Sequence, residues 1–283
     1  MTASTCLKPT ALHASGHGHL RVGLADGLSK ALESWASAPL KLLVPNSRGL
    51  SVWAYLSSFG GGLVAGDQTS VDVNVGPNSR CYLSTQASTK VYRNPSGLAC
   101  SHRLHATIES GGLLIALPDP IQCYSQACYE QRQSFDLAPS AGLVVLDSLC
   151  SGRTERGERW DFTRYSSRTE IRVGGRLVVL DSIHLSAEDG IIGDAMRVGP
   201  YRCFATLTIV GDALRSASDL VIQHFVGAGV LIRPALFCIA SPVQGGVLLR
   251  IAGLSHEEVA RALQEHLQFL SGLLGDHPWS RKW

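Results

Sequence analysis

Four aspartates that follow apolar or glycine-rich stretches are the side chains best placed to do chemistry. Asp147 and Asp181 follow the apolar LVVL of the two copies of the hexapeptide LVVLDS, Asp119 follows a third apolar stretch, and Asp67 follows a glycine run. If the strands stack, Asp147 and Asp181 should lie near one another. Such carboxylates are either satisfied by backbone N–H groups or line a polar channel. Carboxylate and water oxygens hold divalent transition metals less tightly than imidazole or thiolate, so an oxygen-lined channel can pass these cations without trapping them.

Other patterns of metal ligands and nucleophiles are weak. His13, His17 and His19 lie close together near the N-terminus, and His17 and His19 would share one face of a strand. The eight cysteines are scattered without a CxxC pair, so we expect small core residues rather than a closed tetrahedral metal site. The sequence contains no G-x-S-x-G and no H-E-x-x-H motif. The glycine run at 60–66 lacks the Lys-Ser/Thr of a phosphate loop and precedes a strand, which favours a close-packed turn.

A cluster of alternating charges follows the stretch CSG at 150–152. Its members, with the tryptophan beside them, are Arg153, Glu155, Arg156, Glu158, Arg159 and Trp160. One interpretation is a solvated loop with weak ion pairs. The other is a loop that contacts a partner protein, because Arg and Trp are enriched in interface hot spots.

Paired strands must position these side chains, and their pattern repeats along the chain. Residues 71–75 alternate between apolar and polar, which is typical of a half-buried strand, and a turn at 76–78 leads into the apolar stretch 80–85. The same order recurs at 107–117, 134–147 and 169–181. Each unit joins a half-exposed strand to a strand buried on both faces, which favours a β-helical or layered β core. An ordinary sandwich with similar hairpins is the alternative.

Helices are expected only in the C-terminal third. One is predicted over 213–225, and another begins at Ser255, where Ser255 and Glu258 form a capping box ahead of an apolar stripe that continues to Leu274. The predicted fold is therefore mainly β (α+β), with stacked, β-helix-like layered sheets. We expect one domain over 1–283, with an N-terminal extension at about 1–15, a β-rich core at 16–205 and a mixed α/β part at 206–283.

Composition limits the classes of function. The 283 residues include 25 Lys and Arg against 23 Asp and Glu, and this balance provides no electrostatic basis for binding nucleic acid. A hydrophobic share of 45% with only 17% charged residues excludes disorder and indicates surface buried against a partner, around the C-terminal helix and 225–243. Arg233 and Pro234 interrupt that last segment, so we interpret it as two buried strands rather than a membrane span. Scattered cysteines and the lack of a signal peptide favour a reducing cytoplasm.

Several segments resemble the UreD (UreH) family of urease accessory proteins. The specific pair is FGGGLVAGD at 59–67 with STQASTKVYR at 84–93, and the further matches are LPDP at 117–120, YEQR at 129–132, DSLCSGR at 147–153 and GERW at 157–160. The resemblance covers 18–185 strongly and the remainder loosely. The chain departs from the family at 40–46, where bacterial members often carry a Pro-Phe-Tyr-Pro pattern, and at Asp181, where some relatives have Glu.

The resemblance implies a non-enzymatic, mostly β scaffold. Family members bind the accessory protein UreF, which recruits the GTPase UreG, and the assembly docks on apo-urease to help deliver nickel. This implies a hetero-oligomer without a nucleic-acid or membrane partner and without a tightly bound cofactor, through which Ni²⁺ passes transiently. The residues that match the family's nickel passage are Asp67, Thr89, Lys90, Asp147 and Asp181. Further family-motif or partner-contact candidates are Gln68, Thr85, Gln86, Tyr92, Arg93, Asp119, Glu130, Arg153, Glu158 and Trp160.

Two alternatives come from other classes of protein. A β-helical carbohydrate-active enzyme would use paired acids such as Asp147 and Asp181, with carboxylates about 5 to 10 Å apart across an open groove. A purely structural interaction module would bond its strand-end acids to backbone amides. Acids that face an enclosed passage would instead favour the scaffold.

Overall fold

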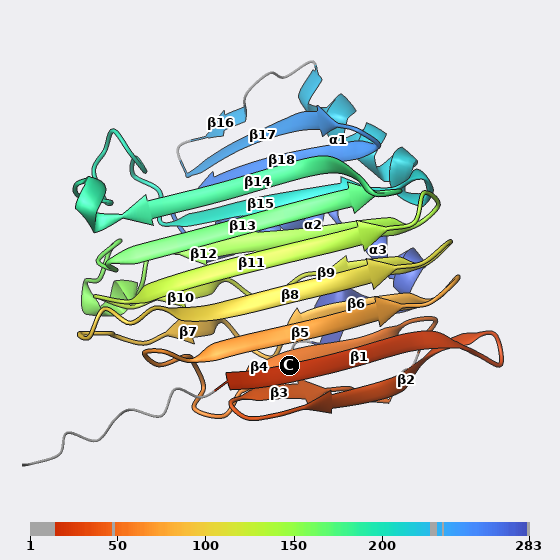
Figure 1. The fold of residues 1–283 in the computed structure, drawn as a ribbon. Coiled ribbons are helices and arrows are strands. Elements are labelled where there is room, and N and C mark those ends of the chain that lie inside the picture. The colour runs from red at the N-terminus through yellow and green to blue at the C-terminus, as the bar shows by residue number, and fades with distance from the viewer. Residues whose placement is uncertain (1–14, 47–48, 227–230, 234, 282–283) are drawn as a thin grey trace, which may run out of the picture.

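Two large β-sheets face each other, and the chain crosses between them repeatedly (Figure 1). The computed structural model describes residues 15–46, 49–226, 231–233 and 235–281. The first sheet has, in order, β14 (Arg176–Ser186), β13 (Arg164–Val173), β11 (Cys128–Leu137), β8 (Cys100–Ile108), β5 (Gln68–Val75), β1 (Ser15–Ala25) and β2 (Leu28–Ala36). The second, over the described residues, has β16 (Leu231–Arg233), β17 (Leu236–Val243), β18 (Gly246–Gly253), β15 (Cys203–Val210), β12 (Gly142–Cys150), β9 (Leu113–Ala116), β6 (Arg80–Thr85), β4 (Val52–Ser58) and β3 (Leu40–Leu43). Two short strands, β10 (Ile121–Cys123) and β7 (Thr89–Val91), extend this sheet beside β12.

The first three repeated units place their two strands in opposite sheets. β5, β8 and β11 pair in parallel in the first sheet, while β6, β9 and β12 pair in parallel in the second. The turns between them stack as well: the Leu113 N–H donates to the Ser79 carbonyl at 2.8 Å and the Gly142 N–H to the Gly112 carbonyl at 2.9 Å. The prediction of stacked, β-helix-like sheets is confirmed, because each turn carries the chain to the facing layer.

The fourth unit is a hairpin, so the prediction for it is wrong. β13 and β14 are antiparallel neighbours in the first sheet, with Arg172 opposite Leu177. Gly174 and Gly175 have φ of 56° and 79°, and two consecutive positive φ values build the type I′ turn that joins antiparallel strands directly. The second copy of LVVLDS therefore lies on an edge strand facing the sheet of the first copy, and Leu177 and Leu180 are exposed rather than buried.

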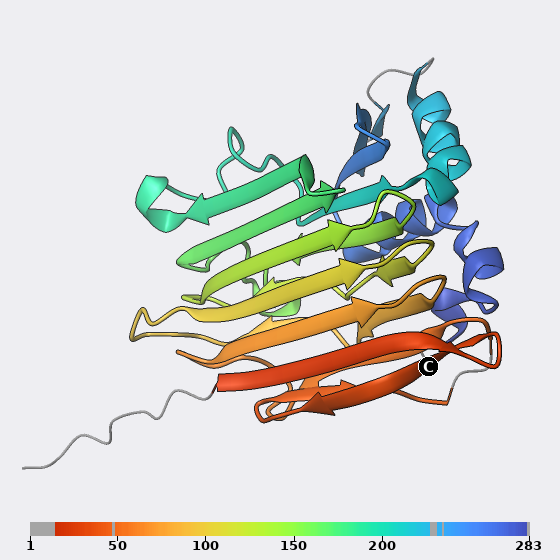
Figure 2. The same cartoon turned by 45° about the vertical axis from the view of Figure 1, so that its right-hand side comes forward.

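Apolar side chains from both sheets fill the space between them, and a second cluster lies on the outer face of the second sheet. That outer cluster packs β15 and β18 against the helices α1 (Arg215–Val226), α2 (His256–His266) and α3 (Leu270–Leu274), which gather in the C-terminal part (Figure 2). Single 3₁₀ turns occupy Thr154–Arg156, Ala187–Asp189, Asp212–Leu214 and Pro278–Arg281. The capping box is confirmed, since the Glu258 N–H donates to Ser255 Oγ at 3.3 Å. The apolar stripe continues as predicted, but the helix is broken at Leu267 and resumes as α3.

Segment 225–243 contains the end of α1 and the strands β16 and β17, so the two predicted strands are present, but of β17 only Leu236 and Cys238 are buried. Residues 227–230 and 234 lie outside the described part. Over the described residues, no helix combines the length and apolarity that crossing a bilayer requires. The large apolar side chains that are exposed do not gather on α2 as predicted. Four of them lie on β1 and β2, at Leu24, Leu28, Leu32 and Trp35. Most of the N-terminal extension, 1–14, is outside the described residues, and the domain division stays a prediction.

Candidate functional site

A cavity of about 270 Å³ lies between the two sheets, and much of its lining is polar. The space between packed sheets is ordinarily filled by apolar side chains, so polar residues here need partners. The first sheet contributes Thr69, His102, Tyr129, Gln131 and Gln133, and the second contributes Ser84, Thr85, Asp147 and Ser148. The segment 86–90 and Asp119 also line the cavity.

Asp147 is, with Asp119, one of the carboxylates that line this cavity. It accepts hydrogen bonds from Ser167 Oγ at 2.5 Å, from Gln131 Nε2 at 3.1 Å and from the Tyr165 hydroxyl at 3.5 Å, and all three donors stand on the facing sheet. Burial raises the pKa of Asp147, the nearby negative charge of Asp181 raises it further, and the three donors act in the opposite direction. Asp147 is therefore a half-buried carboxylate held by side chains of the facing sheet rather than by backbone amides.

His102 brings an imidazole ring to the same cavity. Its Nδ1 lies 2.8 Å from Thr69 Oγ1, which in turn donates to the Ser101 carbonyl at 3.2 Å. Burial lowers the pKa of His102 to about 4, so the ring is neutral at physiological pH. A neutral imidazole and a carboxylate inside one cavity are both groups that can contact a cation.

The five predicted passage residues separate into two groups. Thr89, Lys90 and Asp147 line the cavity. Asp67 does not line it: its Oδ2 accepts from the Val64 N–H at 3.0 Å, which closes the glycine loop. Asp181 also stands outside the lining and forms an ion pair with Arg250 of the second sheet, Nη2 to Oδ1 2.6 Å.

The two segments that carry the sequence resemblance contact each other. The Leu63 N–H donates to the Lys90 carbonyl at 2.8 Å, the Tyr92 N–H donates to the Leu63 carbonyl at 2.9 Å, and the Tyr92 hydroxyl donates to the Gly60 carbonyl at 3.0 Å. A Cβ on Gly62 would lie 2.6 Å from the Lys90 carbonyl oxygen, which explains a glycine at this position. The glycine run thus packs directly against the 89–92 segment. This close contact holds Thr89 and Lys90 in position at the cavity.

The partner-contact candidates have different surroundings. Thr85 and Asp119 form a reciprocal pair at the cavity, in which Thr85 Oγ1 donates to Asp119 Oδ2 at 2.9 Å and accepts from the Asp119 N–H at 2.7 Å. Arg93 Nε donates to Gln126 Oε1 at 2.8 Å, and Glu130 forms an ion pair with Arg132. The exposed members of the set are Gln68, Gln86 and Arg93.

The charged cluster after residue 152 is more ordered than a solvated loop. Arg153 forms an ion pair with Glu158 and lies 4.3 Å from the centroid of the Tyr124 ring. Trp160 is only 3% exposed, and its Nε1 donates to the Tyr201 carbonyl at 3.0 Å. The interpretation of Trp160 as a surface contact is therefore wrong, because its ring belongs to the core.

The N-terminal histidines lie on the outer face of the first sheet. His17 and His19 share one face of β1, as predicted; His17 Nδ1 lies 2.6 Å from Ser70 Oγ, and His19 Nε2 lies 3.6 Å from Glu33 Oε2. His13 lies outside the described residues.

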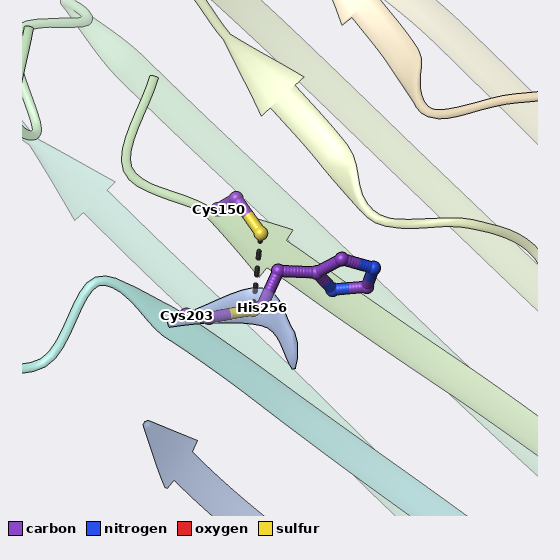
Figure 3. Close-up of side chains that lie close together, drawn as sticks. All are labelled: Cys150, Cys203 and His256. Carbon is purple, nitrogen blue, oxygen red and sulfur yellow. Dashed lines mark hydrogen bonds between the residues drawn. The ribbon is translucent and has the colours of Figure 1, made fainter. Parts of the chain in front are cut away.

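A cluster that the sequence analysis missed stands on the other face of the second sheet. Cys150, Cys203 and His256 each offer a ligand atom, and these atoms lie within 4.8 Å of one another (Figure 3). The sulfurs of Cys150 and Cys203 are 3.0 Å apart. The hydrogen bond between these two thiols lowers the pKa of Cys150, and His256 acts in the same direction. Only strand pairing brings these residues together, so no local motif in the sequence indicates them.

Comparison with known proteins identifies the family. The model of the UreD urease accessory protein family matches residues 14–283. The UreD urease accessory protein of Sorangium cellulosum is 44% identical over 273 residues, which cover 95% of this chain and 85% of that protein. The UreD of an Anaeromyxobacter species is 38% identical, with 94% and 89% coverage, and urease accessory protein D of Oryza sativa subsp. japonica is 31% identical, with 99% of both chains covered. The chain therefore belongs to the UreD family of urease accessory proteins.

Proposed function

We propose that this urease accessory protein is a non-enzymatic scaffold with an internal passage for Ni²⁺. In this proposal it binds UreF, reaches the GTPase UreG through UreF, and docks on apo-urease in the cytoplasm. Nickel is cargo: it enters the space between the sheets, contacts oxygen and imidazole ligands transiently, and leaves toward urease.

The observation that carries this proposal is the cavity between the sheets, with Asp147 and other polar side chains in its lining. Asp147, Gln131 and Thr85, on different strands of the two sheets, bring side-chain oxygens to its lining. Oxygen ligands bind a borderline divalent cation less tightly than imidazole or thiolate does, which suits transfer rather than storage. His102, with its lowered pKa, stays unprotonated and adds no positive charge that would repel the cation.

The alternatives receive less support. The enzyme alternative pairs Asp147 with Asp181, yet Asp181 forms an ion pair with Arg250 and does not line the cavity that contains Asp147. The structural-module alternative requires acids bonded to backbone amides, which describes Asp67 with Val64 but not Asp147. Asp67 is therefore proposed as a residue that shapes the glycine loop beside the passage.

Co-expression with urease and the other accessory proteins tests the passage. Asp147→Ala should leave UreF captured in a pull-down while the nickel content and activity of urease fall. Asp72→Ala, which changes an exposed carboxylate on the outer face of β5, is the matched control and should change neither. If the nickel content of urease is unchanged with Asp147→Ala, the passage is refuted. If the unmodified chain fails to capture UreF, the scaffold is refuted.

A further inference from the structure

Cys150, Cys203 and His256 form a side-chain cluster that the proposed passage does not use. Each contributes one ligand atom, and every pair of these atoms is within 4.8 Å (Figure 3). Cys203 is buried, Cys150 is half-buried and His256 is exposed. Thiolate sulfur and imidazole nitrogen are the ligand atoms that zinc and similar cations prefer in proteins.

Adjacent strands hold the three residues at one end of the second sheet. Cys150 is the last residue of β12 and stands directly opposite Cys203, the first residue of β15. Cys203 in turn stands opposite Gly253, the last residue of β18, and His256 follows three residues later as the first residue of α2. Backbone hydrogen bonds continue past the strand ends, from the Ser151 N–H to the Arg202 carbonyl and from the Arg202 N–H to the Gly253 carbonyl, each 2.8 Å. The ligands therefore stand on rigid elements whose register places them together.

The geometry needs only a small adjustment to enclose an ion. Tetrahedral coordination with metal–sulfur bonds of about 2.3 Å puts the two sulfurs roughly 3.7 Å apart. The two sulfurs now lie 3.0 Å apart, so side-chain rotations that separate them by less than about 1 Å make room for the ion. The N-terminus of α2 faces the cluster through His256, and the positive end of a helix favours thiolates.

The cluster also opens onto a second cavity. This cavity, about 200 Å³, lies between the second sheet and α2 and includes Cys203 and His256 in its lining. Asp119 and Ser148 line both this cavity and the one between the sheets. Ser148 is only 6% exposed, and within the part of the chain that the structure describes its Oγ has no hydrogen-bond partner. An unsatisfied buried hydroxyl beside both cavities indicates a polar occupant such as water or a hydrated ion.

We propose that Cys150, Cys203 and His256 bind one borderline divalent transition-metal cation, of the class of Zn²⁺, Co²⁺ or Ni²⁺, with a fourth coordination position left open. Binding displaces the thiol protons and forms two metal–thiolate bonds and one metal–imidazole bond. Three protein ligands and an open position differ from structural zinc sites, in which four protein ligands close the coordination sphere. The proposal concerns binding to this chain and does not depend on the passage between the sheets.

Titration of the full chain with Co²⁺ tests the site directly. The protein carries no histidine tag and is kept reduced by a phosphine, which leaves the thiols available. One equivalent of Co²⁺ should produce thiolate-to-cobalt charge transfer in the near ultraviolet, and Zn²⁺ should displace it. Cys150→Ala, Cys203→Ala and His256→Ala should each weaken binding by at least about tenfold. His256 is exposed, so its replacement tests the ligand without disturbing the core.

Matched replacements separate the site from the rest of the molecule. Cys123→Ala removes a buried thiol of a different cluster, and His184→Ala removes an exposed imidazole on β14; both should bind Co²⁺ like the unmodified chain. The proposal is wrong if the unmodified chain shows no charge transfer, or if His256→Ala binds with undiminished affinity. Asp147→Asn should retain Co²⁺ binding even where urease activation fails, so failure of the passage and failure of this site give different results.

Discussion

Replacement of Asp147 by asparagine tests whether the fold encloses this carboxylate at a cost in stability. Burial raises the pKa of Asp147 in spite of the hydrogen bonds from Ser167 and Gln131. An acid whose pKa is higher in the folded chain contributes stability that is fully present below its unfolded pKa, about 3.9, and is lost as the pH rises through its folded pKa. At neutral pH the ionised Asp147 is therefore unfavourable relative to a neutral side chain of the same shape.

The magnitude follows from the donors that surround the carboxylate. Asp147→Asn retains a carbonyl acceptor, so its free energy of unfolding at pH 7 should exceed that of the unmodified chain, and the difference should shrink as the pH falls toward 4. Asp147→Ala removes every acceptor and deprives the Gln131 amide and Ser167 hydroxyl of this partner. Loss of a partner for a buried polar group costs about 1 to 3 kcal/mol, so the alanine variant should be that much less stable than the asparagine variant.

Urea unfolding followed by tryptophan fluorescence between pH 4 and pH 7.5 measures these differences. Asp72→Asn, on the exposed face of β5, is the control and should shift the curves little at any pH. The reasoning is refuted if Asp147→Asn and the unmodified chain keep a constant difference across this range, because the carboxyl would then titrate alike in the folded and unfolded chain. A combination of greater stability with lower urease activation would show that the charge is retained for function.

Three further outcomes follow from particular contacts. Burial lowers the pKa of His102 to about 4, so neutral His102 contributes stability above its unfolded pKa near 6.5, and this stability is lost as the pH falls toward 4. The loss is at most about 3 kcal/mol. In urea unfolding, His102→Gln should therefore make the free energy of unfolding depend less on pH. Gly246→Ala would place a Cβ 1.9 Å from the Ile209 carbonyl oxygen and should lower the free energy of unfolding, measured by thermal unfolding, by about 3 kcal/mol. Gly272→Ala, on α3 where a Cβ meets open space, is the control and should not lower it. Thr85→Val deletes both hydrogen bonds between Thr85 and Asp119 and should destabilise the chain by about 1 to 3 kcal/mol; an unchanged urea midpoint would contradict that assignment.

The repeated units were predictable because the alternation of side chains is local. In β5, Val71, Val73 and Val75 are buried and Asp72 is exposed, which is the pattern read from the sequence. The fourth unit shows the limit of that information. The pair Gly174-Gly175 signals a two-residue turn, but an apolar strand after a turn has the same pattern whether it crosses to the facing sheet or returns beside its neighbour. The pattern therefore predicts Leu177 and Leu180 in the interior, whereas both are exposed on an edge strand.

The candidate site was predictable in part. Asp147 was selected because a carboxylate at the end of a buried strand must find polar partners, and the structure supplies Gln131, Ser167 and Tyr165. Asp67 and Asp181 carry the same pattern but have other partners, a backbone N–H and an arginine. Which strand-end acid faces the cavity depends on the facing sheet, and that information is not contained in the local pattern.

The sequence by itself determined the family, through two motifs in the right order, and the mainly β fold, through alternation and turn residues that act within a few positions. Only the tertiary structure decided which side chains meet. The two LVVLDS segments have identical sequences, yet one Asp lines the cavity and the other pairs with Arg250, because their strands stand in opposite sheets. Cys150 and Cys203 are brought together by the register of β12 with β15 and joined by His256 at the start of α2. Strand register and sheet stacking are long-range contacts, and side chains far apart in the chain become neighbours only when those contacts form.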